Sequence, residues 1–269
     1  MIERSGSEMV PVAATAAAAY ELAKRVLGPT ADYIGKELAH FTERRVVNLK
    51  RIFVKAENAL GSRVDEAGRV PPRVLALLLS EGSFCDDELG AEYFGGVLAS
   101  SRSRVGQDDR GVAMMALLGR LSAYQIRCHY GFYATLRIKA KEAAARGKEF
   151  VPFGRVEWNL RDVHMSQDGF DRMMAFEGEE ASRTQALQEH VLAGLGREML
   201  ISNYNMDSPH KPRGSRFRLQ IVPSPLGVEL FLWAHGQPNA SWTAFFDFSL
   251  GLSVDERSLV EIPADCEVG

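Results

Sequence analysis

The chain has 269 residues, of which 46% are hydrophobic and 25% are charged, a composition typical of soluble globular proteins. Its formal net charge of -3 argues against a surface built throughout for nucleic acid and allows only local basic patches. The three cysteines, Cys85, Cys128 and Cys266, are widely spaced, a pattern that fits neither a disulfide framework nor a zinc site. We therefore expect a protein of a reducing, cytoplasmic compartment.

The N-terminal segment is rich in alanine, and residues 12–27 are predicted to form a helix that ends at a Gly-Pro pair. The segment differs from an export signal because Arg4 is offset by nearby acids and Glu21 interrupts the apolar run. No run of about 18 uninterrupted apolar residues occurs, so we expect no membrane-spanning helix. One alternative stays open, in which residues 9–27 lie on a membrane surface or join an oligomeric helical assembly.

A second helix is predicted from an N-cap at Thr30 almost to Gly61, because apolar residues recur at every third or fourth position. Between Lys36 and Lys55 this segment carries six basic residues against two acidic ones, a local charge of +4. The alternative to an ordinary solvated helix face is contact with phosphates or with an acidic partner. The candidate residues for such contact are Arg44, Arg45, Lys50 and Arg51.

Further helices are predicted before residue 150. A short apolar helix follows a Pro-Pro pair, and the next helix contains Gly95 and Gly96, which indicate the close approach of another helix. Ser122 begins a capping-box pattern, so a long helix is expected over residues 123–146. Together these segments predict an N-terminal multi-helix domain over residues 1–149.

Two clusters of side chains invite a catalytic or metal-binding interpretation, but the sequence favours a structural one for each. Asp86, Asp87 and Glu88 are consecutive at a predicted helix start, where acids favour the positive end of the helix dipole. Cys128 and His129 are neighbours in a helix, so they point about 100° apart and cannot act together as nucleophile and base. Without a phosphate-binding glycine loop, metal-ligand spacing or nucleophile motif, we predict a non-enzymatic protein with no cofactor and no metal.

The second half of the chain is predicted to differ from the first in fold class. Residues 150–158 are expected to form a linker that crosses the surface. Residues 159–246 are predicted to form a winged-helix-like α+β module, and residues 247–269 an acidic, frayed tail. The predicted fold class is therefore mainly α, with an N-terminal helical bundle followed by a winged-helix-like C-terminal module.

Three kinds of local pattern support this module. Apolar residues at helical spacing from Val191 to Leu200 are followed by a polar loop over residues 203–215. Apolar and polar residues then alternate around Leu219, which is typical of a half-buried strand. The segment after two prolines turns helical again and stops at Gly236. In a winged helix, the polar loop corresponds to the wing.

The predicted wing is basic, because residues 208–218 contain no acid. Its basic residues are Lys211, Arg213, Arg216 and Arg218. Such a segment suits contact with phosphates. The preceding helix offers only Arg197 and Glu198 as polar side chains near its end, which is little for reading base edges. We therefore predict a protein-docking module, with phosphate contact as the alternative.

Four short motifs occur in a fixed order. They are G-P-T at residues 28–30, E-Y-F-G-G-V-L-A-S-S at 92–101, R-L-S-A-Y-Q-I at 120–126 and P-S-P-L-G-V-E-L-F at 223–231. This order resembles the abortive-infection alpha (Abi-alpha) family, a bacterial domain of unknown function. The chain departs from the family pattern at Tyr93-Phe94, where a tryptophan region is usual, and at Ala123, where a proline is usual. It also departs at Pro223-Ser224-Pro225, where the family has a leucine-threonine pair before the proline.

The resemblance implies a fold and role only in outline. It spans roughly residues 28–236 and implies phage defence by abortive infection, and it brings no established catalytic residues. We expect a non-enzymatic defence protein that acts by binding protein or nucleic acid, with self-association included. The alternatives are a winged-helix DNA-binding regulator and a membrane-acting effector that uses residues 1–27.

Overall fold

A computed structural model describes residues 12–28, 43–147, 163–176, 178–206, 219–250, 252, 260–261, 263 and 266–268. The chain divides into two compact units. Unit 1 comprises Met1–Asp87 and Ala91–Gly119, and unit 2 comprises Glu88–Gly90 and Arg120–Gly269. The fold is mainly helical with one small antiparallel sheet, so the coarse fold class predicted from the sequence is confirmed. None of the described helices is long and apolar enough to cross a membrane.

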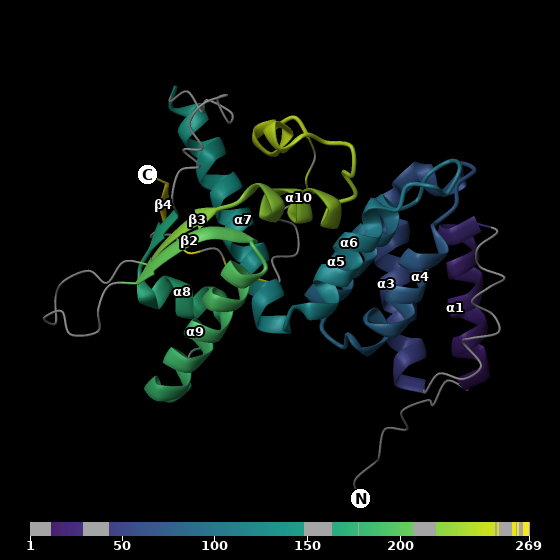
Figure 1. Ribbon diagram of the computed structural model, residues 1–269, viewed down its shortest axis with the longest axis horizontal. Helices are drawn as coiled ribbons and strands as arrows, with labels where there is room; N and C mark the ends of the chain where they lie inside the picture. The colour runs from purple at the N-terminus through teal and green to yellow at the C-terminus, as the bar shows by residue number, and fades with distance from the viewer. Residues whose placement is uncertain are drawn as a thin grey trace, which may run out of the picture. The chain divides into compact units, whose positions relative to one another are not determined.

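Unit 1 is built from helices. These are α1 (Val12–Leu27), α3 (Glu43–Leu60), α4 (Pro72–Ser80), α5 (Glu88–Ser100) and α6 (Arg110–Arg120), with the 3-10 turns η2 (Gly61–Asp65) and η3 (Gly82–Phe84). In Figure 1, α1 lies along α3, which it contacts extensively. The core side of α3 is lined by Val46, Leu49, Ile52, Phe53 and Ala56, as its apolar spacing predicts.

The predicted close helix approach at the paired glycines is confirmed at Gly95. A side chain added there would collide with the backbone of Ala56 and with Lys55, so α5 can cross α3 closely only because this position has no Cβ. The predicted helix after the Pro-Pro pair is also confirmed. It is α4, in which Pro72 occupies the first turn, where the missing N–H costs no hydrogen bond.

Unit 2 combines helices with the sheet. Its elements are α7 (Ala123–Ala145), β1 (Val163–Met165), α8 (Gln167–Met174), α9 (Ala181–Arg197), β2 (Ile201–Met206), β3 (Leu219–Pro223), α10 (Pro225–Ala234), η4 (Trp242–Phe246) and β4 (Glu267–Val268). The sheet order is β2-β3-β1-β4, and each neighbouring pair is antiparallel. Ile221 at the centre of β3 lies opposite Val163 of β1 and Tyr204 of β2.

Helix α7 is the central helix of unit 2. It contacts α8, α9, α10, η4 and the sheet, and most of its residues from Gln125 to Arg137 are buried. Its start confirms the predicted capping box, because Ser122 Oγ accepts from the Gln125 N–H while the Gln125 side chain accepts from the Ser122 N–H. Figure 1 shows α9 beside β2, with which it is also in contact.

The boundaries inside the chain differ from those predicted. The contacts group α7 with unit 2, because the buried side of this helix packs on α9 and α10. The predicted linker, residues 150–158, lies outside the described residues. The part of the acidic segment 247–269 that is described is not frayed, because β4 pairs with β1 and both Val260 and Cys266 are buried.

Two strands of the structure are absent from the prediction. Residues 163–165, to which no strand was assigned, form β1, and residues 203–206, expected in the loop, belong to β2. Both strands owe their conformation to pairing with β3. The polar sequence of β2 reads as a loop because Ser202, Asn203 and Asn205 are exposed and the strand has no buried face over these residues.

Candidate interaction surfaces

Two of the four predicted binding cations on α3 hold the turn η3 in place. Arg45 donates through Nε to Ser83 Oγ (3.0 Å) and through Nη2 to the Leu79 carbonyl (3.1 Å). Its guanidinium also lies over the Phe84 ring, 4.3 Å from the centroid, where a cation is attracted to the ring face. Arg51 donates to the Asp86 carbonyl (2.8 Å). These contacts give both arginines a structural role within unit 1.

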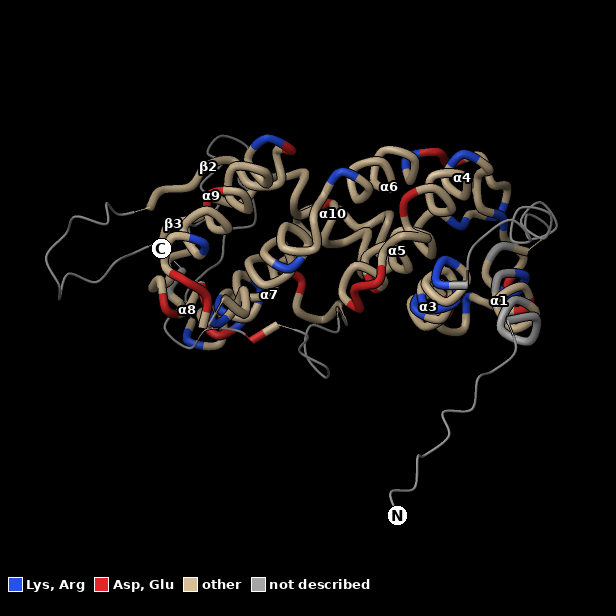
Figure 2. Tube along the Cα trace, turned by 90° about the horizontal axis from the view of Figure 1, so that it is seen from below, with Lys and Arg blue, Asp and Glu red and all other residues tan. Residues whose placement is uncertain are grey.

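The other two predicted cations, Arg44 and Lys50, are exposed. Figure 2, in which α3 is seen nearly end-on, shows basic residues on this helix. Val47 and Val54, which are also exposed, lie three residues after Arg44 and four after Lys50, on the same side of the helix. Of the four predicted cations, Arg44 and Lys50 are exposed, and they lie beside the exposed Val47 and Val54. Two cations next to valines offer few contacts to phosphates.

The acidic cluster after η3 shows no features of a metal site. In the described part of the chain, no group of three or more His, Cys, Asp or Glu side chains is arranged to hold a metal ion. Burial raises the pKa of the nearby Cys85 thiol to about 11, and the charges of Asp87 and Asp86 add to this increase. The thiol is therefore protonated at neutral pH and is a poor nucleophile.

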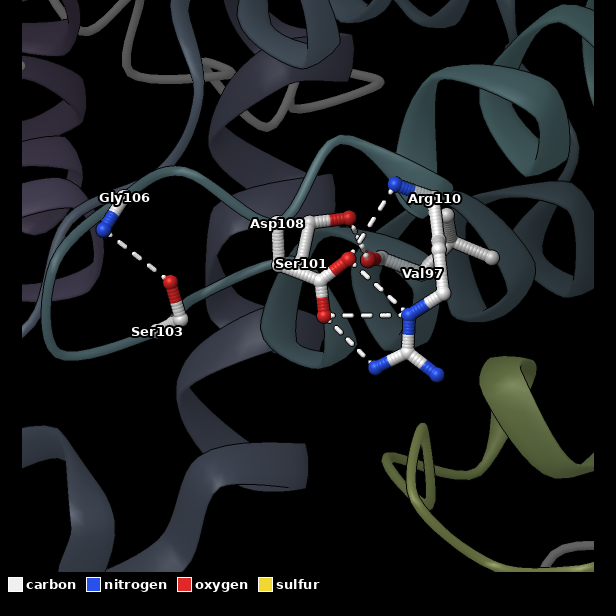
Figure 3. A network of polar contacts seen from close by, with 6 residues as sticks. All are labelled: Val97, Ser101, Ser103, Gly106, Asp108 and Arg110. Carbon is white, nitrogen blue, oxygen red and sulfur yellow. Dashed lines mark hydrogen bonds and ion pairs between the residues drawn. The ribbon is translucent and has the colours of Figure 1, made fainter.

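A polar network joins the α5–α6 connection to the start of α6 (Figure 3). The Asp108 carboxylate accepts from the Arg110 N–H (3.2 Å), from Arg110 Nε (2.9 and 3.1 Å) and from Arg110 Nη2 (2.6 Å). These bonds lower the pKa of Asp108. Ser101 donates to the Val97 carbonyl (2.7 Å), and Gly106 donates to Ser103 Oγ (3.0 Å). These contacts fix the conformation of the connection, and both carboxylate oxygens of Asp108 accept hydrogen bonds from Arg110.

A second polar cluster lies inside unit 2. The Tyr133 hydroxyl donates to the Leu200 carbonyl (2.7 Å) and accepts from the Ser224 N–H (3.0 Å). Ser224 Oγ accepts from the Gly227 N–H (3.0 Å) and donates to the Met199 carbonyl (2.6 Å). The cluster thus ties the start of α10 to α7 and to the chain after α9. A Cβ at Gly227 would overlap with both the Tyr133 hydroxyl and the Leu200 carbonyl.

The Cys128–His129 pair belongs to this core and is not a reactive site. Both side chains are fully buried. The His129 Nε2 lies 3.0 Å from the Gly227 carbonyl, and burial lowers the pKa of His129 to about 3. Burial also raises the pKa of Cys128. A neutral thiol and a neutral imidazole without solvent access match the structural interpretation of the sequence.

An arginine anchors the chain that follows α10. Arg137 of α7 donates to the carbonyls of Phe245, Asp247 (2.9 Å) and Leu250 (2.9 Å). Its guanidinium also lies near the rings of Phe245 and Phe248. Arg137 is nearly fully buried, so these carbonyls supply the hydrogen bonds that water would otherwise provide.

The four basic residues of the predicted wing lie outside the described residues. They are Lys211, Arg213, Arg216 and Arg218. The described strands on either side, β2 and β3, end and begin with Met206 opposite Leu219, so residues 207–218 connect a hairpin. A shallow apolar depression lies at the base of this hairpin, lined by Phe170, Leu192, Met206 and Leu219 together with two glutamines, and it is too small to enclose a ligand.

The exposed side of α9 is balanced in charge. Arg183 pairs with Glu179 (3.1 Å), and Arg197 and Arg120 both pair with Glu198 (3.3 and 2.9 Å). These two arginines lower the pKa of Glu198. Since its cations already face carboxylates, this side of α9 presents little net positive charge to a phosphate backbone.

Large apolar side chains are exposed where α9 leads into β2. Met199 is 69% exposed and has a left-handed backbone conformation, with φ of 56°. Tyr204 on β2 is 36% exposed, and its ring lies beside Gly196 of α9. We name this region the α9–β2 surface and define it by its exposed residues. They are Ala193, Arg197, Met199, Ser202, Asn203, Tyr204 and Asn205.

The sequence prediction missed this surface. Met199 fits the apolar helical spacing and was expected to pack inward, but α9 ends before it with Arg197. The Leu200 N–H donates to the Leu195 carbonyl (2.8 Å), the bond that closes a Schellman motif and leaves Met199 at its left-handed position. Glycine usually marks this position, so the sequence R-E-M-L gave no such signal.

No protein-family model, curated protein or solved structure matches the chain.

Proposed function

We propose that the chain is a non-enzymatic binding protein whose unit 2 is a winged-helix-like module that docks a protein partner through the α9–β2 surface. The observation that carries this proposal is the exposure of Met199 and Tyr204 next to cations that are already paired. Exposed apolar side chains beside neutralised charges favour a protein partner, because aromatic residues and methionine are enriched in protein interfaces.

The order of elements supports the winged-helix part of the proposal. A helix, a strand, two helices and a hairpin follow one another as α7, β1, α8, α9 and β2–β3. The first strand pairs with the second strand of the hairpin, in the order β2-β3-β1. In this proposal the wing comprises residues 207–218, which link β2 to β3 in the sequence.

Phosphate contact is the second candidate function, favoured by the basic composition of the hairpin connection. Its four cations would contribute mostly electrostatic, sequence-independent affinity that decreases with salt. The paired cations of α9 supply little base recognition. Nucleic-acid binding would therefore be weak and non-specific.

We further propose that the docking serves phage defence by abortive infection. This part rests on the resemblance to the Abi-alpha family carried by the four ordered motifs. The resemblance brings no catalytic residues, and in this proposal the protein acts by engaging a partner.

Phage plating separates these proposals. We expect the wild-type gene to lower plating efficiency and the double variant Met199→Ser/Tyr204→Ser to lose this effect. A variant with alanine at Lys211, Arg213, Arg216 and Arg218 should retain it. The matched control is Ala186→Ser on the exposed side of α9, and circular dichroism checks the folding of each variant.

The outcomes discriminate between the candidate functions. If protection survives in the Met199/Tyr204 double variant but is lost in the wing variant, phosphate contact and not protein docking is the function that protects the cell. A salt-dependent shift of a labelled duplex that depends on the wing cations would support that replacement. If the wild-type gene has no effect on a broad phage panel, the defence role is wrong.

A further inference from the structure

Strand β2 lies at one edge of the described sheet, and β4 lies at the other. It pairs with β3 on one side, and within the described residues no strand pairs with its other side. The Tyr204 N–H donates to the side-chain oxygen of Asn203 (2.8 Å), so this backbone donor is directed to an acceptor outside the ladder with β3. The amide oxygen of Asn203 occupies the position where the carbonyl of another strand would accept this hydrogen bond.

The edge has few of the features that prevent strands from pairing. Natural edge strands are usually protected by lysine, other charges, proline or bulges. None of the six residues of β2, I-S-N-Y-N-M, is charged or a proline. A register shift lies between Ile201 and Asn203, which leaves residues 203–206 as a regular segment. Its exposed side chains, from Asn203 to Asn205, are neutral.

We infer that a second copy of this chain binds at β2, so that two β2 strands pair antiparallel across a twofold axis at Tyr204. The inference rests on the proposed docking function and names the partner of the α9–β2 surface. In this register Tyr204 of one copy faces Tyr204 of the other, and each N–H donates to the opposite carbonyl in place of Asn203. Asn203 then faces Asn205 of the second copy, a neutral amide pair.

Self-pairing suits this edge better than pairing with a charged segment. A twofold axis places identical residues near each other, which repels when they carry charge and does not when they are neutral. The exposed rings of Tyr204 and the side chains of Met199 lie next to the same edge. Covering them would add apolar contact to the backbone hydrogen bonds.

The test measures the mass of the full chain in solution by light scattering during gel filtration. We expect twice the mass of the 29.7 kDa chain at micromolar concentration. Tyr204→Lys should halve the measured mass, because two lysines would meet at the axis. The matched control Ser202→Ala changes an exposed residue of the same strand away from the axis and should leave the dimer intact.

Cysteine cross-linking tests the register. In a Cys85→Ser background, where Cys128 and Cys266 are buried, Tyr204→Cys should form an intermolecular disulfide under mild oxidation. The Cα atoms of such a pair lie about 5.5 Å apart, within the range of a disulfide. Ser202→Cys should not cross-link, because the two copies of residue 202 would be roughly 13 Å apart along the strands.

A monomeric wild-type chain, a dimer that persists in Tyr204→Lys, or equal cross-linking of both cysteine variants would overturn the inference. The proposed function is tested separately, by phage plating. A monomer whose phage protection still depends on Met199 and Tyr204 would mean that the α9–β2 surface docks another protein. A dimer of the predicted register without any such dependence would uphold the inference and contradict the proposed function.

Discussion

Unit 1 and unit 2 both contain side chains that bind backbone carbonyls, but they place these side chains in different surroundings. In unit 1, the partly exposed Arg45 and Arg102 hold the turns η3 and η2. In unit 2, the fully buried Tyr133 and His129 bind the start of α10 and the residue before β2. When such a contact is removed, water can reach the freed carbonyl in unit 1 but not in unit 2. Similar hydrogen bonds should therefore differ in their contribution to stability.

The difference also affects how the surface is used. In unit 1, contacts with η3 and the residues beside it engage two of the four α3 cations that were predicted to bind a partner, Arg45 and Arg51. In unit 2 the polar contacts of Tyr133, His129 and Ser224 are neutral and buried. The exposed α9–β2 surface keeps its apolar side chains accessible. A charged helix face alone therefore does not identify a binding surface, because residues distant in the sequence can engage its cations.

Gly227→Ala should have the largest effect. The added Cβ would overlap with the Tyr133 hydroxyl and the Leu200 carbonyl, so the free energy of unfolding should decrease by about 3 kcal/mol or more. Urea unfolding at pH 7 measures this change. The matched control is Gly196→Ala on α9, where the nearest side-chain atom is 3.9 Å away; it should be neutral or slightly stabilising. Equal destabilisation by both variants would contradict the close packing at Gly227.

Acid should destabilise unit 2 through the buried His129 and the part-buried His235. Burial lowers the pKa of His129 to about 3 and that of His235 to about 4, from 6.5. As the pH decreases below 6.5, the unfolded chain binds protons that the folded chain excludes. Stability should therefore decrease by up to about 1.4 kcal/mol per pH unit for each histidine. The measurement is urea unfolding at pH 7 and pH 5.

The control for this pH dependence is His129→Gln, whose amide can still reach the Gly227 carbonyl but does not titrate in this range. Between pH 7 and pH 5, the free energy of unfolding of the variant should decrease by about 2 kcal/mol less than that of the wild type. An unchanged pH dependence in the variant would mean that His129 is not held neutral by the fold.

Arg102→Lys should have a smaller effect, in unit 1. Arg102 donates to the carbonyls of Arg63, Val64 and Glu66 at η2, and a lysine cannot reach three carbonyls at once. Because the site is partly open to water, the expected loss is about 1 to 2 kcal/mol. Thermal unfolding followed by circular dichroism measures it. A loss as large as that of Gly227→Ala would remove the contrast between the units.

Met199→Gly should have the smallest effect and the opposite sign. Glycine adopts the left-handed conformation of residue 199 without strain, so stability should increase by about 0.5 to 1 kcal/mol. The same change should weaken docking, since it removes an exposed apolar side chain. A loss of stability, measured by urea unfolding, would show that Met199 contributes to packing and is not available to a partner.

The sequence predicts best those elements whose boundaries are encoded locally. The capping box at Ser122 and the proline at the start of α4 are local signals, and both helices begin where these signals place them. Strand β1 has only three residues, which is too short for its alternation to be recognised in the sequence, and β2 has no regular alternation; both form through pairing with β3. Short strands of this kind depend on residues far along the chain.

The candidate sites were harder to predict for the same reason. Whether Arg45 is available depends on Ser83 and the Leu79 carbonyl, more than 30 residues away. Whether Met199 is buried depends on where α9 ends, and the Schellman turn there uses no glycine. Residue type and spacing alone carry neither piece of information.

The contacts of Arg137 determine where a stable fragment of the protein can end. A chain cut after Gly236 would contain the sheet strands β1 to β3 and α10 but would leave the guanidinium of Arg137 buried without the three carbonyls it binds. A fragment of unit 2 that is to be expressed alone therefore needs to extend beyond Leu250. The hydrogen bonds from Arg137 should also slow proteolysis between α10 and Leu250, even at residues of this segment that are exposed.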